Sequence, residues 1–595
     1  MPGSLARNAR TVPQPLAAPQ AGMARARAER ARRPGPSRLV PAAAAVLAAA
    51  VLASCAGGGG TSRAGVSWAG RAVVTAAAYR VPGGRAAPPG TAVLTQRGGN
   101  TRVGWNYHET ILNTRNVNAS SFGRRVAYPV DSKIYAQPLF VPGLRVDGRL
   151  HNVVIVATEA DSVYAFDADV SGPPPAPLWH TSFLVHGAVP VPDSTLNCTS
   201  IAPGFGITGT PVIDRATGTL YLVAAMKVGG VVTDYLHALS ITTGRDRIAP
   251  VRIAASVRGT GLGSHHGVLA FSAREEQQHM GLLLDRGVVY AGFASYCDRD
   301  PFHGWILGYR ASDLHQVMVY NTTPDGVNGG VWQSATGLAA SSAGDLFFIT
   351  GDGTYDLASG GRDVSDSVLE MRPEHGTLAV VHYFTPFYQA CLAAKDQDYG
   401  SGAPLLLPGE IIAAGKEGAI IVLSRSSFGG YHPIPRPCAQ MGRTNVDHIV
   451  QELPPQTVAG GVWSAETSWA GRAGRYVYTA GEADHLKAWR LVDGKLVSPP
   501  ASHAAETMDY PGGIPAGSSD GGDPATAIVW IMDQEKGPAL RAYAAGDLAR
   551  ELYNTQADPG RDAIPAYDNF CLPAVTDGRV FVGTAGELLI YGLLH

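Results

Sequence analysis

Residues 162–183 read SVYAFDADVSGPPPAPLWHTSF, a pattern that predicts two strands joined by a turn. Its first part alternates apolar and polar residues, which is typical of a half-buried strand, and a turn rich in Gly and Pro leads to a second strand, PLWHTSF. One hairpin cannot bury its own apolar face, so a stable fold needs further copies. The chain contains them, and they begin at Leu236, Ile306, Val368, Ile420, Leu486, Leu540 and Leu588.

Each copy belongs to a unit of about four strands, as YAQPLFV, NVVIVAT, SVYAFDA and PLWHTSF show for the first. The eighth unit supplies only three strands before the chain ends, while one extra strand, GRRVAYPV (123–130), precedes the first unit. We therefore predict an all-β, eight-bladed β-propeller in which this N-terminal strand completes the last blade and removes its exposed edges. A seven-bladed ring is the alternative, because the first strand of the seventh unit is weak. An open solenoid is the other alternative, but it would need capping repeats, and the sequence shows no such repeats.

The composition suits many short strands. Charged residues make up 16% of the chain and hydrophobic residues 45%, with 72 Gly and 42 Pro. A disordered chain rich in Gly and Pro is excluded, because the hydrophobic residues are abundant and recur with the spacing of strands.

The N-terminus is predicted to be a lipoprotein signal. An Arg-rich stretch is followed by LVPAAAAVLAAAVLAS, which is short for a membrane span, and the run ends in LASC, which resembles the lipobox of bacterial lipoproteins. This predicts a signal peptide over 1–54, lipidation of Cys55, and a place in the bacterial cell envelope on the extracytoplasmic side. An ordinary secretory signal is the alternative, and translation could start at Met1 or Met23. We predict a flexible tether over 55–100 and a single propeller domain over 101–595.

Charge and cysteines narrow the function further. Without residues 1–54 the chain has 39 basic and 48 acidic residues, a net charge near −9, which argues against nucleic acid as a partner. Outside the cytoplasm some of the remaining five cysteines should pair, and their odd number leaves at least one thiol. Their spacing does not indicate a zinc site. These cysteines are Cys198, Cys297, Cys391, Cys438 and Cys571.

In a propeller, the loop that leads into each innermost strand and the loop after each second strand open on the same face. Charged residues recur at the end of the second strand in successive units. They are candidates for binding a polar ligand or a cation; the alternative is that they form ion pairs and hydrogen bonds between blades. These residues are Glu159, Lys227, Asp352, Lys416, Glu417, Glu482 and Asp533.

The loops that lead into the innermost strands add aromatic and imidazole groups. The motif Gly-Gly-Val-Trp-x-Ser occurs twice and places Trp332 and Trp463 where they could stack on a flat ligand or fill the channel. His265 and His303 are further ligand candidates, with structural hydrogen bonding as the alternative. The loops 350–356 and 395–402 carry carboxylates that could bind Ca²⁺, or could be ordinary turns.

The hairpin VYAFDADV…LWH and the stretch NVNASSFGRRVAYPVDSKIYAQPLF resemble the pyrroloquinoline-quinone (PQQ) repeat family. That family includes quinoprotein alcohol dehydrogenases and the propeller lipoprotein of the outer-membrane assembly machinery. The resemblance implies the propeller fold, and it makes PQQ and Ca²⁺ possible cofactors. The adjacent cysteine pair found in many of the dehydrogenases does not occur in this chain, and only the first repeat keeps both Asp167 and Trp179 of the docking motif.

We therefore expect a monomeric binding or scaffold protein that takes a protein partner or a small polar ligand on the channel face. A PQQ- and calcium-dependent dehydrogenase of alcohols or sugars is the alternative. No catalytic residue is predicted.

Overall fold

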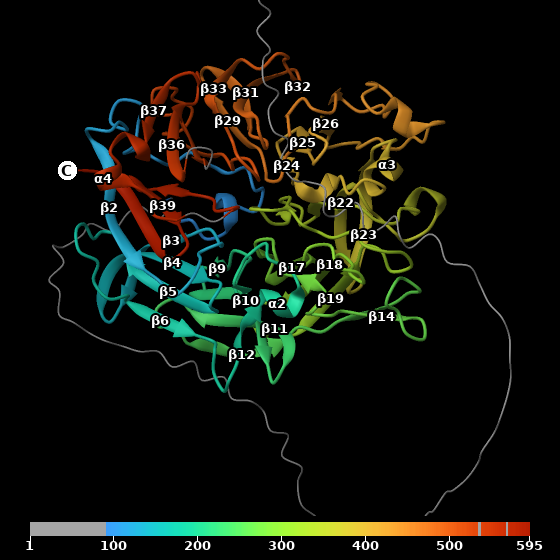
Figure 1. Ribbon diagram of the computed structural model, residues 1–595, viewed down its shortest axis with the longest axis horizontal. Helices are drawn as coiled ribbons and strands as arrows, with labels where there is room; N and C mark the ends of the chain where they lie inside the picture. The colour runs from blue at the N-terminus through green and yellow to red at the C-terminus, as the bar shows by residue number, and fades with distance from the viewer. Residues whose placement is uncertain (1–90, 534–536, 567–568, 595) are drawn as a thin grey trace, which may run out of the picture. The chain divides into compact units, whose positions relative to one another are not determined.

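The computed structural model describes residues 91–533, 537–566 and 569–594 (Figure 1). The predicted signal peptide, Cys55 and most of the predicted tether lie outside these residues. No helix within them is long and apolar enough to cross a membrane.

Besides one separate two-stranded sheet, the described chain forms eight β-sheets that follow one another around a ring, in chain order (Figure 1). The sheets are the eight predicted blades, so the eight-bladed prediction is confirmed and the seven-bladed alternative is wrong. From the centre outward, blades one to four are formed by β3 (Leu139–Val146), β4 (Arg149–Thr158), β5 (Ser162–Asp167) and β6 (Trp179–Ser182); β9 (Val212–Asp214), β10 (Thr219–Val228), β11 (Val231–Ser240) and β12 (Asp246–Arg252); β16 (Leu283–Asp285), β17 (Val288–Ser295), β18 (Trp305–Arg310) and β19 (Gln316–Asn321); β20 (Ala339–Ala340), β21 (Leu346–Ile349), β22 (Val368–Glu374) and β23 (Thr377–Thr385). Blades five to eight are formed by β24 (Leu405–Leu406), β25 (Glu410–Ala414), β26 (Ile420–Ser424) and β28 (Gln451–Leu453); β29 (Thr467–Gly471), β30 (Gly474–Thr479), β31 (His485–Val492) and β33 (Ser502–Thr507); β34 (Ala516–Ser518), β35 (Ile528–Asp533), β36 (Ala539–Ala544) and β37 (Glu551–Asn554); β38 (Ala574–Thr576), β39 (Arg579–Gly583), β40 (Glu587–Leu593) and β2 (Phe122–Pro129).

Shorter elements supplement the blades or fill the connections between them. Blade two is extended by β7 and β8, blade three by β15, blade four by β27, blade six by β32 and blade seven by β1. Their bounds, with those of the β13–β14 hairpin and the helices, are β1 (Trp105–Asn106), β7 (Val189–Pro192), β8 (Gly204–Phe205), β13 (Ser256–Arg258), β14 (Val268–Ala270), β15 (Glu276–Gln277), β27 (Gly430–Tyr431), β32 (Lys495–Leu496), α2 (Asp193–Leu196), α3 (Gln389–Ala393), α4 (Pro559–Asp562), η3 (Gln96–Gly98), η4 (Leu357–Ser359), η5 (Tyr399–Ser401), η6 (Pro437–Gln440) and η7 (Thr555–Ala557).

The hydrophobic core lies mainly between the blades. The buried clusters join the facing sheets of neighbouring blades, for example blades two and three through Val223, Phe293 and Trp305. The middle strands of a blade are buried on both faces because each blade packs against two others, as in β5, where all six residues are buried.

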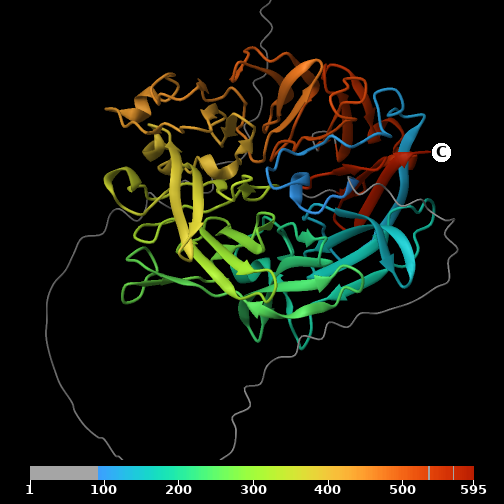
Figure 2. The ribbon, with the colours of Figure 1, turned by 180° about the vertical axis from the view of Figure 1, so that it is seen from behind.

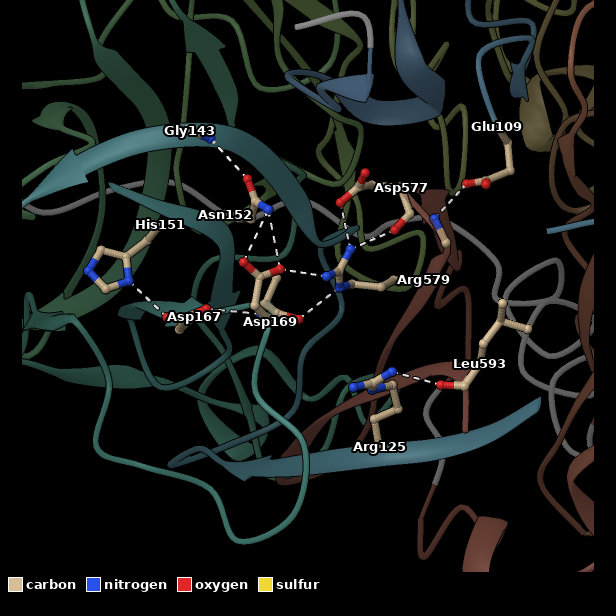
Figure 3. Close-up of polar contacts among 12 residues, drawn as sticks. Glu109, Arg125, Gly143, His151, Asn152, Asp167, Asp169, Asp577, Arg579 and Leu593 are labelled. Atoms are coloured by element: carbon tan, nitrogen blue, oxygen red, sulfur yellow. Dashed lines mark hydrogen bonds and ion pairs between the residues drawn. The ribbon is translucent and has the colours of Figure 1, made fainter. Parts of the chain in front are cut away.

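The ring closes as predicted. β2 pairs antiparallel with β40, from Phe122 opposite Leu593 to Pro129 opposite Glu587. In Figure 1 the light-blue β2 lies beside the red C-terminal strands. Arg579 of β39 joins this blade to blade one, because its guanidinium contacts Asp169 at 2.5 Å and donates a hydrogen bond to the Ala168 carbonyl at 2.9 Å (Figure 3).

The described chain begins at residue 91, ten residues before the predicted start of the domain. The segment 91–107 crosses one end of the central channel, and Figure 2 shows it in blue across the middle of the ring. It bonds to innermost strands around the ring: Val93 pairs with Phe140 of blade one, and β1 pairs in parallel with β34 of blade seven. We call residues 91–107 the plug. The prediction of a flexible tether is therefore wrong for residues 91–100.

Two arginines hold the plug in place, and both are buried. Arg102 donates hydrogen bonds to the carbonyl oxygens of Leu338 and Leu282, both at 2.9 Å, in blades four and three. Arg97 donates to the Glu466 carbonyl at 2.5 Å, next to blade six. Burial lowers the pKa of Arg102 to about 9, so the guanidinium remains charged at neutral pH.

Two disulfides tie loops outside the blades. Cys198 pairs with Cys297, and Cys391 pairs with Cys438. Cys571 remains a thiol, and its Sγ donates a hydrogen bond to the Ile134 carbonyl at 3.1 Å. The expectation that some of these cysteines pair and one remains a thiol is confirmed.

Candidate functional site

A cavity of about 190 Å³ opens at the end of the channel away from the plug. Most of its lining comes from the segments that connect one blade to the next and from the loops after second strands. These are the loops that the sequence predicts on one face. The lining residues are Tyr135, Ser200, Gln277, His279, Cys297, Asp298, Trp332, Ser334, Asp398, Ser401, Lys416, Trp463, Tyr510 and Phe570.

The repeated Gly-Gly-Val-Trp motif brings both predicted tryptophans to this cavity. The glycines let the chain pass close to neighbouring backbone: Gly461 has φ +85°, and a Cβ there would collide with the Lys416 carbonyl. Trp463 lies edge-to-face with Tyr510, with ring centroids 5.2 Å apart. The Nε1 of Trp332 is buried and has no hydrogen-bond partner among the described residues.

Lys416 is the one basic side chain among the residues that line the cavity. Its Nζ lies 2.5 Å from Asp398 Oδ2, 2.9 Å from Asp396 Oδ1 and 5.0 Å from the centroid of the Trp463 ring. Burial would raise the pKa of Asp398, but the attraction to Lys416 outweighs it, and the pKa lies below its ordinary value. The charge of Lys416 is therefore already balanced within the protein.

Further carboxyl groups surround this ion pair. The Asp352 backbone N–H donates to Asp398 Oδ1 at 2.8 Å, and carboxylate oxygens of Asp352, Asp396 and Asp398 lie within 4.8 Å of one another. Burial and the charge of Asp398 raise the pKa of Asp352 to about 9 and that of Asp298 to about 7. The two loops proposed from the sequence to bind Ca²⁺ thus meet, but the Lys416 ammonium contacts two of the three clustered carboxylates, those of Asp396 and Asp398.

The inner wall combines aromatic groups with a buried imidazole. His279 packs edge-to-face against Trp332, with ring centroids 6.1 Å apart, and lies 5.7 Å from the rings of Tyr135 and Phe570. Burial lowers the pKa of His279 to about 4, so the imidazole is neutral at pH 7. The Cys198–Cys297 disulfide also reaches the cavity through Cys297.

The structure brings together four of the predicted site residues, Trp332, Asp352, Lys416 and Trp463, and Glu482 lies beside Trp463. The other candidates do not line the cavity. Glu159 accepts hydrogen bonds from Gly206 and Thr208, and Lys227 donates to Thr195. His303 bonds to Thr323 and the Leu262 carbonyl, and Asp533 is ion-paired with Arg541. Glu417 is buried, and His265 is exposed in the β13–β14 hairpin.

Several lining residues were not identified from the sequence. Tyr135, His279, Tyr510 and Phe570 lie in irregular connections between blades, where no period identifies an inward-facing side chain. The sequence did identify the loop 395–402 as a possible Ca²⁺-binding loop, and Asp396 and Asp398 belong to it.

The described strands and this cavity define an eight-bladed β-propeller with a cavity at one mouth. Quinohemoprotein alcohol dehydrogenase ADHIIG from Pseudomonas putida HK5 has the same fold, with 12% identity and a TM-score of 0.55 over 85% of this chain and 80% of that chain. The quinohemoprotein alcohol dehydrogenase of Comamonas testosteroni is 13% identical, with a TM-score of 0.55 over 85% of this chain and 81% of that chain. No protein-family model and no curated protein matches the sequence.

Proposed function

We propose that the protein is a binding propeller whose mouth cavity takes a small, neutral, polyhydroxylated molecule, such as a monosaccharide or a polyol. The observation that carries this proposal is the pairing of aromatic walls with hydrogen-bonding groups whose charges are already balanced. The C–H faces of a sugar pack against rings such as Trp332 and Trp463. Its hydroxyls can donate hydrogen bonds to Asp298, which lines the cavity.

PQQ itself does not fit these residues. It is a planar quinone with three carboxylates, and such an anion needs cationic partners. The cavity lining holds one Lys and two carboxyl groups, those of Asp298 and Asp398, and Lys416 is held by Asp396 and Asp398. A PQQ- and calcium-dependent dehydrogenase remains the second candidate, and the shared fold with the two quinohemoproteins supports it.

We expect saturable binding of at least one member of a panel of monosaccharides and polyols, followed by calorimetry. Trp463→Ala should weaken this binding at least tenfold, about 1.4 kcal/mol, because it removes one aromatic wall. Asp493→Asn, in an exposed turn at the opposite end of blade six, is the control and should leave the affinity unchanged. Asp577 is unsuitable as a control, since it contacts Arg579 at 2.5 Å.

The proposal fails if no neutral polyol binds, or if Trp463→Ala and Asp493→Asn weaken binding equally. Binding of a protein to this face, weakened by charge reversal at Glu482 but unaffected by sugars, would favour the scaffold role instead.

We also propose that the protein is anchored by a lipid on Cys55, on the outer side of a bacterial membrane. The two disulfides support an oxidising environment outside the cytoplasm. A Cys55→Ala variant should leave the membrane fraction and become soluble after cell fractionation, because it lacks the thiol that carries the lipid. Unchanged partitioning of this variant would refute the anchor.

A further inference from the structure

Blades four and five enclose a group of buried oxygen atoms that have no hydrogen-bond partner among the described residues. They are both carboxylate oxygens of Glu417, Oε2 of Glu452, and the hydroxyl oxygens of Tyr388 and Tyr399. Glu417 is 1% exposed, and both tyrosines are 0% exposed. Buried polar atoms are nearly always satisfied, so such a concentration calls for a bound species that satisfies them.

Different elements bring these side chains together. Glu417 lies in the turn between β25 and β26, and Glu452 lies in β28, the outer strand of the same blade. Tyr388 immediately precedes α3, and Tyr399 begins η5, both in the connection from blade four to blade five. The Cys391–Cys438 disulfide fixes α3, so the two phenols are presented by an anchored segment.

No cation of the described residues is paired with the carboxyl groups at this point. Neither Glu417 nor Glu452 forms an ion pair with any residue that the structure describes, and Lys416 is engaged by Asp396 and Asp398 instead. Burial and neighbouring carboxylates raise the pKa of both glutamates to about 8, and burial and the charge of Glu417 raise those of Tyr388 and Tyr399. Bringing a divalent cation to two carboxylates would neutralise them and satisfy the oxygens at once.

We propose that Glu417, Glu452 and the hydroxyls of Tyr388 and Tyr399 form a buried site for one Ca²⁺ ion between blades four and five. Carboxylate and hydroxyl oxygens are hard ligands, and Ca²⁺ tolerates the irregular geometry that such a set offers better than Mg²⁺ does. The site is distinct from the mouth cavity, and it would tie the connection that carries Asp396 and Asp398 to blade five.

The test uses the chain without its signal peptide, stripped with a chelator and then given Ca²⁺ or Tb³⁺. We expect one Ca²⁺ per chain by elemental analysis, a higher melting temperature with Ca²⁺, and Tb³⁺ luminescence on excitation of tyrosine. Glu417→Gln keeps the shape of the side chain and should weaken Ca²⁺ binding at least tenfold. Tyr399→Phe should lower the Tb³⁺ luminescence even if the fold is unchanged.

Asp396→Asn is the matched control, because Asp396 belongs to the other acidic cluster and is largely exposed. It should leave Ca²⁺ binding and the thermal shift unchanged. The proposal is overturned if the wild-type chain binds no Ca²⁺ at saturation, which would mean that water alone fills the site. It is also overturned if Asp396→Asn abolishes binding while Glu417→Gln does not.

Discussion

Deletion of residues 118–131 should abolish the folded ring. The deletion removes β2, which pairs with β40 and contributes the buried side chains of Phe122, Val126 and Tyr128. At about 2 kcal/mol for each large apolar side chain, the loss is comparable with a typical stability of roughly 5–15 kcal/mol. It also exposes β40 as a new edge strand, so we expect aggregation in size-exclusion chromatography together with loss of the cooperative melting transition.

The matched control is deletion of residues 56–90, which ends before the plug. It should leave the melting temperature close to that of the full mature chain. If the two deletions melt alike, then the ring does not depend on the N-terminal strand.

Arg102→Met should be the most damaging single substitution considered for the plug. Arg102 donates to the carbonyl oxygens of Gln96, Leu282 and Leu338 and to Thr95 Oγ1, and methionine can replace none of these bonds. Three buried carbonyl groups would lose a donor at about 1–3 kcal/mol each, so we expect a loss of roughly 3 kcal/mol or more in the free energy of unfolding. Denaturant titration measures it.

Arg115→Met provides the comparison, because Arg115 is exposed and lies in the same N-terminal region. It should change the free energy of unfolding by no more than about 0.5 kcal/mol. A loss as small as this for Arg102→Met would mean that the plug does not hold the blades together.

The ring could be predicted because its strands repeat a local pattern. Period-2 alternation in units such as 162–183 identifies the strands, and counting them identifies the missing strand of the last blade. The predicted closing strand, 123–130, differs from β2 by one residue at each end. The weak first strand of the seventh unit is explained by β1, which supports the three-residue β34 from the plug.

The plug could not be predicted, because it has no period of its own. Its residues make single bridges and side-chain bonds to blade after blade, so its sequence looks like a linker. Arg97 and Arg102 do not stand out as core residues in the sequence, since arginine is rarely buried unless its donors are satisfied. Here the inner strands supply carbonyl groups that are far away in the sequence.

The site was predictable only where it follows the repeat. The loops that lead into innermost strands carry Trp332 and Trp463, and the loops after second strands carry Asp352 and Lys416. The ring brings both kinds of loop to one mouth. The same rule also selected Glu159, Glu417 and Asp533, which lie buried. Whether a charge at the end of a second strand faces the mouth or a neighbouring blade depends on packing that no local pattern records.

We propose that this propeller binds a ligand at its mouth and does not act as a quinoprotein enzyme. The most direct measurement is reconstitution with PQQ and Ca²⁺, following the absorbance of bound cofactor and the reduction of an artificial electron acceptor with a panel of alcohols and aldoses. We predict neither stoichiometric PQQ binding nor substrate-dependent dye reduction, because Lys416 is already paired and no other cation lines the cavity. One PQQ bound per chain, with turnover of any alcohol or sugar, would contradict the account.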